Sequence, residues 1–306
     1  MDQMITVNSI GEVHQLFELP KPKHPLISII YHSDELEEKF QQLSSVKCVL
    51  NLYSVMFKEG CTGSLNYGRG SYDFEEGSMV FLAPGQVIQP NEMEQDQSED
   101  NKGWTLIFHP DLIRRSNLGQ NIDDYSFFNY DVNEALHLSD QEKISVSEII
   151  HKIEAELNGN IDKHSQKLIV SNIELLLDYS TRYYDRQFYT RTNQSNDLVA
   201  KFEKYLKVYF NSGLASEKGL PSVRSCGEEL GLSPNYLSDL LKKETGVNAH
   251  DHIHHAIINR AKTELLKGQN SVSSIAYDLG FEYPQHFSKL FKNKTGMSPK
   301  DYRLLN

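Results

Sequence analysis

The stretch GFEYPQHFSKLFKNKTG at residues 280–296 has a counterpart about fifty residues earlier, GLSPNYLSDLLKKETG at residues 231–246. Both begin with Gly and an apolar residue, pass through Pro, and carry two apolar residues after a Ser and a charged residue. Both end in Thr-Gly after lysines, and the second copy has one extra residue before its Pro. A Gly permits a tight turn, and Pro is favoured at the first position of a helix. The sequence therefore predicts the same turn and helix twice.

A further short helix is predicted in front of each Gly, at residues 223–230 and 272–279, followed by second helices over about 234–244 and 284–294. Ser233 is the expected N-cap of the first of these second helices. A short helix, a turn with Gly and a helix with a polar outer face form a helix-turn-helix, whose second helix fits the major groove of DNA. One such pattern is weak evidence, whereas two copies in register are much stronger. We predict helix-turn-helix motifs at 223–244 and 272–294.

The helical periodicity also predicts which side chains are buried and which face outward. The residues expected in the core are Leu237, Leu240 and Leu241 in the first copy and Phe287, Leu290 and Phe291 in the second. The residues expected to bind DNA are Asn235, Ser238, Asp239, Lys242 and Lys243 in the first copy and Gln285, His286, Ser288, Lys289, Lys292 and Lys294 in the second. The lysines would neutralise phosphates. Which of the other residues would contact bases is left open.

A helix is predicted between the two copies, at residues 249–267, with Ile253, Ile257, Ala261 and Leu265 on one stripe. At ~1.5 Å per residue it spans roughly 28 Å. One turn of B-DNA is ~34 Å. A connecting helix of this length can hold two recognition helices near successive major grooves.

With these motifs, residues from about 198 to 303 resemble the DNA-binding domain of the AraC/XylS family of bacterial transcription regulators. The resemblance rests on SVSSIAYDLGF at 271–281, HFSKLFKNKTGMSPKDYR at 286–303 and the first copy at 231–246. It implies promoter DNA as the partner and an N-terminal cupin-like β-barrel, followed by helices that mediate effector sensing or dimerisation.

The chain departs from the family pattern at Ala249, His252, Ile257, His286 and Asp239. The change at Asp239, where relatives often carry Arg, bears on function because an acid facing DNA repels phosphate unless it accepts a hydrogen bond from a cytosine amino group. We therefore expect the second helix to hold phosphate more strongly, and whether the first helix reads bases is left open.

Residues 25–108 contain short β-branched and aromatic runs, among them 26–31, 48–57 and 104–108, separated by turns with Gly or Pro. Such a pattern is typical of a sandwich or small barrel. The predicted fold is α+β, with a cupin-like β sensing domain at 1–138, a helical segment at 139–190, a linker at 191–196 and an all-α DNA-binding domain at 197–306.

The helical segment is predicted to begin with a capping box, in which Ser139 is the N-cap and Glu142 reaches back. Apolar residues at helical spacing follow, including Ile144 in the first helix and Leu168 in the second. These two helices could pair between subunits to form a homodimer or pack on the β region, and the sequence favours neither.

Charge differs between the two parts of the chain, although the whole carries −11. From Asp197 onward there are 15 basic and 12 acidic residues, a net charge of +3, and the remainder carries −14. Such asymmetry is typical of parts with different partners, but a net charge of +3 over 110 residues is also ordinary, and the charge alone favours neither interpretation. The chain shows no secretory signal or membrane-spanning run and its three cysteines are far apart, so we expect a cytoplasmic protein with no membrane partner.

No catalytic residue, cofactor or metal site is predicted. His250, His252, His254 and His255 form a cluster, and His250 and His254 have a spacing that can bind a metal, but exposed or cap-adjacent imidazoles are the preferred interpretation. Enzymatic cupins need several histidines around a metal, and there is none between residues 53 and 108. We therefore expect a regulator and not an enzyme. The alternative is a ligand-binding or enzymatic cupin whose C-terminal domain binds proteins. The sequence identifies no residues for a small-molecule effector.

Overall fold

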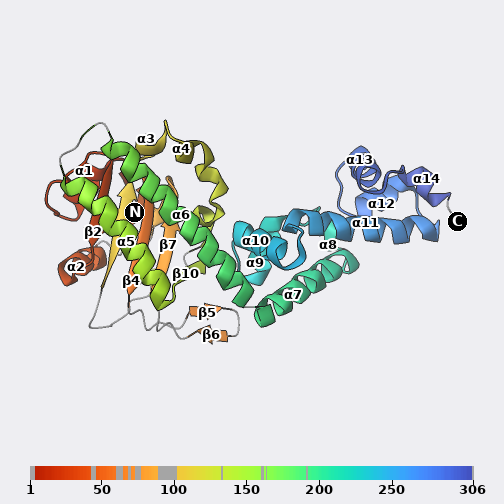
Figure 1. Cartoon of the computed structure of the whole chain (residues 1–306). Helices are drawn as coiled ribbons and strands as arrows, with labels where there is room; N and C mark the ends of the chain where they lie inside the picture. Colours follow the sequence, from red (N-terminus) through yellow and green to blue (C-terminus); the bar gives the residue numbers. More distant parts are fainter. Residues whose placement is uncertain are drawn as a thin grey trace. The chain divides into compact units, whose positions relative to one another are not determined.

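The computed structural model describes residues 4–42, 46–59, 65–67, 70–72, 77–88, 102–131, 134–159, 162, 164–190 and 192–304. The chain divides into two compact units, Met1–Thr190 and Arg191–Asn306. The first unit combines sheets with helices, and the second is helical (Figure 1). We expected residues 191–196 to form a linker. From Thr192 onward they are instead part of a helix that continues to Asn211 in the second unit.

The strands of the first unit are short, as the spacing of Gly and Pro in this region predicts. Those within the described residues are β1 (Met4–Val7), β2 (Ile27–Tyr31), β3 (Lys47–Leu50), β4 (Tyr53–Glu59), β5 (Leu65–Tyr67), β6 (Gly70–Tyr72), β7 (Ser78–Leu82), β8 (Gln86–Ile88), β9 (Lys102–Phe108) and β10 (Leu136–His137).

The strands form three separate sheets. A five-stranded antiparallel sheet has the order β10-β7-β4-β9-β2, a three-stranded sheet has the order β1-β3-β8, and β5 pairs with β6. Within the described residues, the outer strands β10 and β2 do not pair with each other, so the five-stranded sheet stays open. The predicted α+β class is correct, whereas the described strands do not form a closed cupin-like barrel.

One apolar run predicted as a single strand is in fact two. Residues 48–57 are divided between β3 and β4, which belong to different sheets. The change of direction occurs at Asn51 and Leu52. The backbone N–H of Asn51 donates to the carbonyl of Val7, 2.9 Å away, and Leu52 is fully buried. An interrupted strand with apolar residues on both sides of the break has the same composition as a continuous one, so the sequence did not reveal it.

The helices of the first unit follow the strands or connect them. They are α1 (Ile10–Leu16), α2 (Asp34–Gln42), α3 (Pro110–Ile113), α4 (Asn117–Asn121), α5 (Asp140–Asn158) and α6 (Ser165–Thr190), with 3₁₀ turns at Ile122–Asp124 and Ser126–Asn129. The long helices α5 and α6 pack against each other. Residues before β2, for which no element was predicted, contribute Val7, Ile10 and Val13 to an apolar cluster beside β3.

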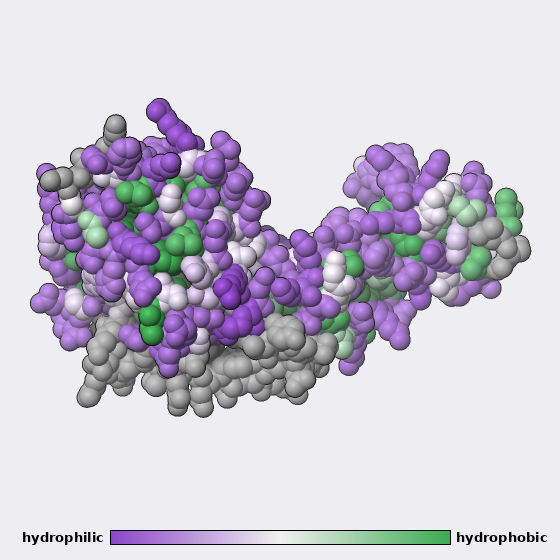
Figure 2. Space-filling view, viewed as in Figure 1, coloured by the Kyte–Doolittle hydropathy of each residue, from purple (hydrophilic) through white to green (hydrophobic). Residues whose placement is uncertain are grey.

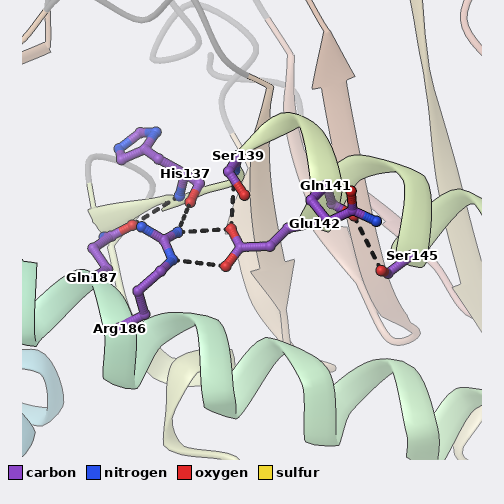
Figure 3. Close-up of polar contacts among 7 residues, drawn as sticks. All are labelled: His137, Ser139, Gln141, Glu142, Ser145, Arg186 and Gln187. Carbon is purple, nitrogen blue, oxygen red and sulfur yellow. Dashed lines mark hydrogen bonds and ion pairs between the residues drawn. The ribbon is translucent and has the colours of Figure 1, made fainter.

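A polar network joins the start of α5 to the end of α6 (Figure 3). The predicted capping box at the start of α5 is present, and Glu142 accepts a hydrogen bond from the backbone N–H of Ser139 at 2.9 Å. The same carboxylate binds Arg186 of α6 through two contacts, 2.7 Å to Nε and 2.9 Å to a terminal nitrogen. Arg186 also donates to the carbonyl of His137 in β10. This bidentate pair, in which Glu142 is mostly buried and Arg186 is partly exposed, fixes both helix ends to the sheet.

Two apolar residues of this helical pair lie on the surface, although their spacing predicted burial. Ile144 of α5 is 52% exposed and Leu168 of α6 is 46% exposed. Ile149, Ile153 and Ile173 are buried as expected. Figure 2 shows green, apolar surface on the face of the first unit where α5 and α6 lie in Figure 1.

The second unit is built from helices, and the bounds of the longer ones agree with the predicted ranges at 223–230, 234–244, 249–267 and 284–294. The helices are α7 (Thr192–Asn211), α8 (Leu214–Lys218), α9 (Val223–Leu230), α10 (Pro234–Thr245), α11 (Ala249–Lys267), α12 (Val272–Asp278), α13 (Pro284–Thr295) and α14 (Pro299–Arg303). Across the described part of the chain, no helix combines the length and apolar character needed to cross a membrane.

Candidate nucleic-acid interface

The first helix pair, α9 and α10, is joined by a tight turn at Gly231. This residue has a φ of 69°, a left-handed conformation that Gly adopts without the steric cost of a side chain. The N–H of Leu232 donates to the carbonyl of Gly227 at 2.9 Å. The buried Ser233 then caps α10, because its hydroxyl accepts the N–H of Tyr236 at 3.2 Å. Pro234 occupies the first helical position, as predicted.

The second pair, α12 and α13, is joined at Gly280 under tighter conditions. Gly280 has a φ of 93°, and a side-chain carbon there would lie 2.7 Å from the carbonyl oxygen of Ala215 and 2.7 Å from the carbonyl carbon of Gly219. The N–H of Phe281 donates to the carbonyl of Ala276 at 3.0 Å, matching the bond at the first turn. Tyr283 occupies the N-cap position of α13 without a capping bond from its side chain.

The core-facing sides of α10 and α13 agree with the prediction, with one exception. Leu237, Leu240 and Leu241 are buried in α10, and Phe287 and Phe291 are buried in α13. Leu290 is only partly buried. Tyr236, whose burial was not predicted, is 1% exposed. A tyrosine in the first turn of a helix can face the core or the solvent, so only the tertiary packing decides whether its side chain is buried.

The two recognition helices end in the same way. The hydroxyl of Thr245 donates to the carbonyl of Leu241 at 2.8 Å, and the hydroxyl of Thr295 donates to that of Phe291 at 2.7 Å. Each Thr is followed by a left-handed Gly with nothing near its missing side chain. The repeated Thr-Gly is therefore a helix terminator used twice.

Helix α11 connects the two pairs over the predicted 19 residues. Asn248 caps it by accepting the N–H of Asp251 at 2.9 Å. Its apolar stripe is buried as expected, including Ile253, Ile257 and Leu265. Because α11 contacts α9 and α10 as well as α12 and α14, it holds both helix pairs in one unit (Figure 1).

The predicted DNA-binding residues lie on the outer faces of α10 and α13. Those on the surface are Asn235, Lys242, Lys243, Gln285, His286, Lys289, Lys292 and Lys294, and those that are half-buried are Ser238, Asp239 and Ser288. The hydroxyl of Ser288 donates to the carbonyl of Pro284 at 3.0 Å, within its own helix. Neither Lys289 nor Lys292 makes an ion pair with any described residue.

Lys294 differs from the other lysines of α13. Its Nζ lies 2.8 Å from Oδ1 of Asp251, at the start of α11. The pair ties the end of the second recognition helix to the connecting helix and lowers the pKa of Asp251, chiefly through the hydrogen bond from Lys294. Lys294 is therefore engaged within the protein, which the sequence could not indicate because the two residues are 43 positions apart.

Two surface aromatic residues flank the second pair and were not among the predicted site residues. Tyr283 is 48% exposed and packs edge-to-face on the ring of His286, with centroids 5.4 Å apart. Tyr277 on α12 is also exposed. The replacement of a capping Ser by Tyr before Pro284 is the sequence feature that could have identified Tyr283.

Comparison with known proteins matches this part of the chain. The family model described as a helix-turn-helix domain matches residues 226–304. The uncharacterized HTH-type transcriptional regulator YijO of Escherichia coli (strain K12) is 29% identical over 143 residues, which is 46% of this chain and 46% of that protein. The uncharacterized transcriptional regulatory protein YesN of Bacillus subtilis (strain 168) is 32% identical over 95 residues, 29% of this chain and 26% of that protein. The match spans less than half the length of each relative.

Solved structures match the same region. The C-terminal domain of AraT, a response regulator from Geobacillus stearothermophilus, is 28% identical, with a TM-score of 0.32 over 35% of this chain and 84% of that one. The C-terminal domain of the response regulator yesN from Fusobacterium nucleatum is 27% identical, with a TM-score of 0.31 over 35% of this chain and 98% of that one. On the family match and the sequence relatives, the second unit carries an AraC-type helix-turn-helix domain, which confirms the resemblance seen in the sequence.

Proposed function

We propose that this chain is a sequence-specific, double-stranded DNA-binding transcription regulator whose recognition helices are α10 and α13. The observation that carries the proposal is the repetition of a complete helix-turn-helix within one unit, at α9–α10 and at α12–α13. Each copy has its own left-handed Gly turn and its own terminating Thr-Gly. The geometry fits DNA because α11, at roughly 28 Å, is close to one ~34 Å turn of the duplex.

The charges of the two recognition helices favour unequal contributions. Residues 234–245 contain two lysines, one Asp and one Glu, whereas residues 284–295 contain three lysines and no acid. Phosphate contacts by lysines supply the salt-dependent part of DNA affinity. Lys289 and Lys292 are exposed and are the residues we assign to phosphate on α13. On α10, Asp239 opposes phosphate contact, and Asn235 and Lys242 are the residues best placed to reach DNA.

The first unit is proposed to modulate DNA binding through a small molecule or a partner protein, as the N-terminal domains of this type of regulator are expected to do. Its five-stranded antiparallel sheet with a separate three-stranded sheet is compatible with an open relative of a cupin fold. No effector residue is assigned, and the regulator is proposed to act without an enzymatic step.

The first unit is also proposed to mediate homodimerisation through α5 and α6. The support is the surface position of three large apolar residues, Ile144 on α5 and Leu168 and Leu175 on α6. Sedimentation equilibrium of the full chain should detect a dimer that Ile144→Asp and Leu168→Asp weaken. Ser145→Asp on the same helix is the matched control, and equal masses for all variants would contradict this proposal.

The test of DNA binding is a gel-shift titration of the full-length protein on the DNA upstream of its own gene, repeated over a series of salt concentrations. The double variant Lys289→Ala/Lys292→Ala should bind more weakly at every salt concentration. Its plot of log affinity against log salt should have a slope smaller by about 1.8, because each lost phosphate contact removes about 0.9.

The control for this titration is Lys207→Ala, an exposed lysine on α7 outside both helix-turn-helix copies. It should keep the parent slope. Absence of any salt-sensitive duplex binding by the parent protein would refute the proposed function. An unchanged slope in the double variant would instead remove these two lysines from the interface.

A further inference from the structure

Three potential metal ligands meet at the start of α11. His250, Asp251 and His254 each offer one ligand atom, and these atoms all lie within 4.8 Å of one another. The two imidazole rings are one helical turn apart, with centroids separated by 4.1 Å. Among the His, Cys, Asp and Glu side chains of the described residues, these three lie close enough together to hold a metal ion.

The separations are close to those of a metal site. An ion with tetrahedral ligands at ~2.1 Å holds its ligand atoms roughly 3.4 Å apart. The three ligand atoms lie within 4.8 Å of one another, and His250 is exposed while the other two residues are half-exposed, which leaves the side chains room to rotate toward that distance. Two imidazole nitrogens with one carboxylate oxygen form a set that suits Zn²⁺, Ni²⁺ or Cu²⁺ and does not suit Mg²⁺, which prefers oxygen ligands.

We propose that His250, Asp251 and His254 form a binding site for a divalent transition-metal ion, in competition with the ammonium group of Lys294. Lys294 Nζ occupies the carboxylate side of this cluster, 2.8 Å from Asp251 Oδ1. A metal bound to the same carboxylate repels the ammonium group and releases Lys294 from α11. Metal binding would therefore replace the ion pair between Lys294 of α13 and Asp251 of α11 by a metal bridge within α11.

The position of Asp251 in α11 favours its role as the acidic ligand. Asp251 lies in the first turn of α11, where the N-terminal partial charge of the helix favours the ionised carboxylate.

The neighbouring histidines provide a matched comparison. His255 is exposed, follows His254 directly and does not belong to the cluster. His252 is bound elsewhere, with Nε2 2.7 Å from the hydroxyl of Thr245. Of the four neighbouring histidines, only His250 and His254 belong to the cluster in the structure. The sequence indicated this pair by its spacing of four residues.

The test is isothermal titration calorimetry of Zn²⁺ into the full-length, metal-stripped protein, with Mg²⁺ as the comparison ion. The parent and His255→Ala should take up one Zn²⁺ at this site with equal Kd. His250→Ala and His254→Ala should each weaken it by about tenfold or more, because one of three ligands is lost. Lys294→Met should tighten it roughly twofold to fivefold, the range expected when an exposed ion pair no longer competes.

Circular dichroism should show that each variant is folded. His250 is exposed, so its replacement by Ala is not expected to disturb packing. Equal Zn²⁺ affinity in the parent, His250→Ala and His254→Ala proteins, or no saturable uptake by the parent, would overturn the site. Unchanged affinity in Lys294→Met would overturn the competition. These readouts contain no DNA, so they stand or fall independently of the proposed function.

Discussion

The two helix-turn-helix copies share a backbone framework but differ at the turn and on the outer face. Helices α10 and α13 have the same length and the same positions for Pro and for Thr-Gly, offset by 50 residues. At the turn, the buried cap Ser233 is replaced by two residues ending in Tyr283, which does not cap. The two helices are equally long, so the extra residue of the second copy lies in the turn before α13 and does not lengthen the helix.

Equivalent outer positions also behave differently. Tyr236 is buried in α10, whereas His286 at the same position of α13 is exposed. Asp239 corresponds to Lys289, and Glu244 corresponds to Lys294. The comparison teaches that the core contacts and terminators define the motif, while the outward residues are free to differ in charge.

The largest expected effect tests the difference between the turns. Gly280→Ala should destabilise the second unit by about 3–4 kcal/mol, since a Cβ combines an unfavourable φ with contacts below 3 Å to backbone atoms of residues 215 and 219. Gly231→Ala, where the φ is positive but the space is open, should cost only about 1 kcal/mol. Urea unfolding followed by far-UV circular dichroism measures both.

The single tryptophan, Trp104, lies in β9 of the first unit and provides an internal control. Its fluorescence transition should stay in place in both variants while the circular dichroism transition of the second unit moves. Equal shifts for Gly280→Ala and Gly231→Ala would show that the two turns are equally constrained.

A second test concerns the helix before each turn. Gly227 in α9 corresponds to Ala276 in α12, and a Cβ at 227 would lie 2.5 Å from the carbonyl oxygen of Leu232. Gly227→Ala should therefore cost about 2 kcal/mol, although Ala is the better helix former. Ala276→Gly should cost about 1 kcal/mol through helix propensity alone. A stabilising Gly227→Ala, seen by the same unfolding assay, would mean that position 227 accommodates a Cβ as well as position 276 does.

Charge exchange at Asp239 and Lys289 tests the outer faces and rests on the proposed function. Asp239→Asn should tighten duplex binding a few-fold by removing repulsion, and Lys289→Gln should weaken it by up to about tenfold. Fluorescence anisotropy with labelled upstream DNA at constant salt measures both changes. If the two variants change affinity equally and in the same direction, the inequality between the helices is wrong.

The smallest expected effects concern the caps. Ser233→Ala should destabilise by about 1 kcal/mol, because the N–H of Tyr236 loses its acceptor in a buried position. Tyr283→Ser should stabilise by about 0.5 kcal/mol by supplying the missing cap of α13. Thermal unfolding by circular dichroism suffices for both. A destabilising Tyr283→Ser would show that the packing of Tyr283 on His286 outweighs a cap.

Local chemistry made much of the second unit predictable. The starts of α10 and α13 were predictable from Pro234 and Pro284, and that of α10 also from its cap Ser233, because capping and Pro act within a few residues. The outward faces followed from helical periodicity for the same reason. In the first unit the capping box at Ser139 was predictable on the same basis.

The sequence by itself thus determined the type and the ends of the helices in both helix-turn-helix motifs, along with the α+β class. Only the tertiary structure decided the division of residues 48–57 between two sheets, the open edges of the five-stranded sheet, and the exposure of Ile144 and Leu168. It also decided that Lys294 binds Asp251. These features depend on residues far apart in the chain, and hydrophobic periodicity records whether a face is apolar but not which partner covers it.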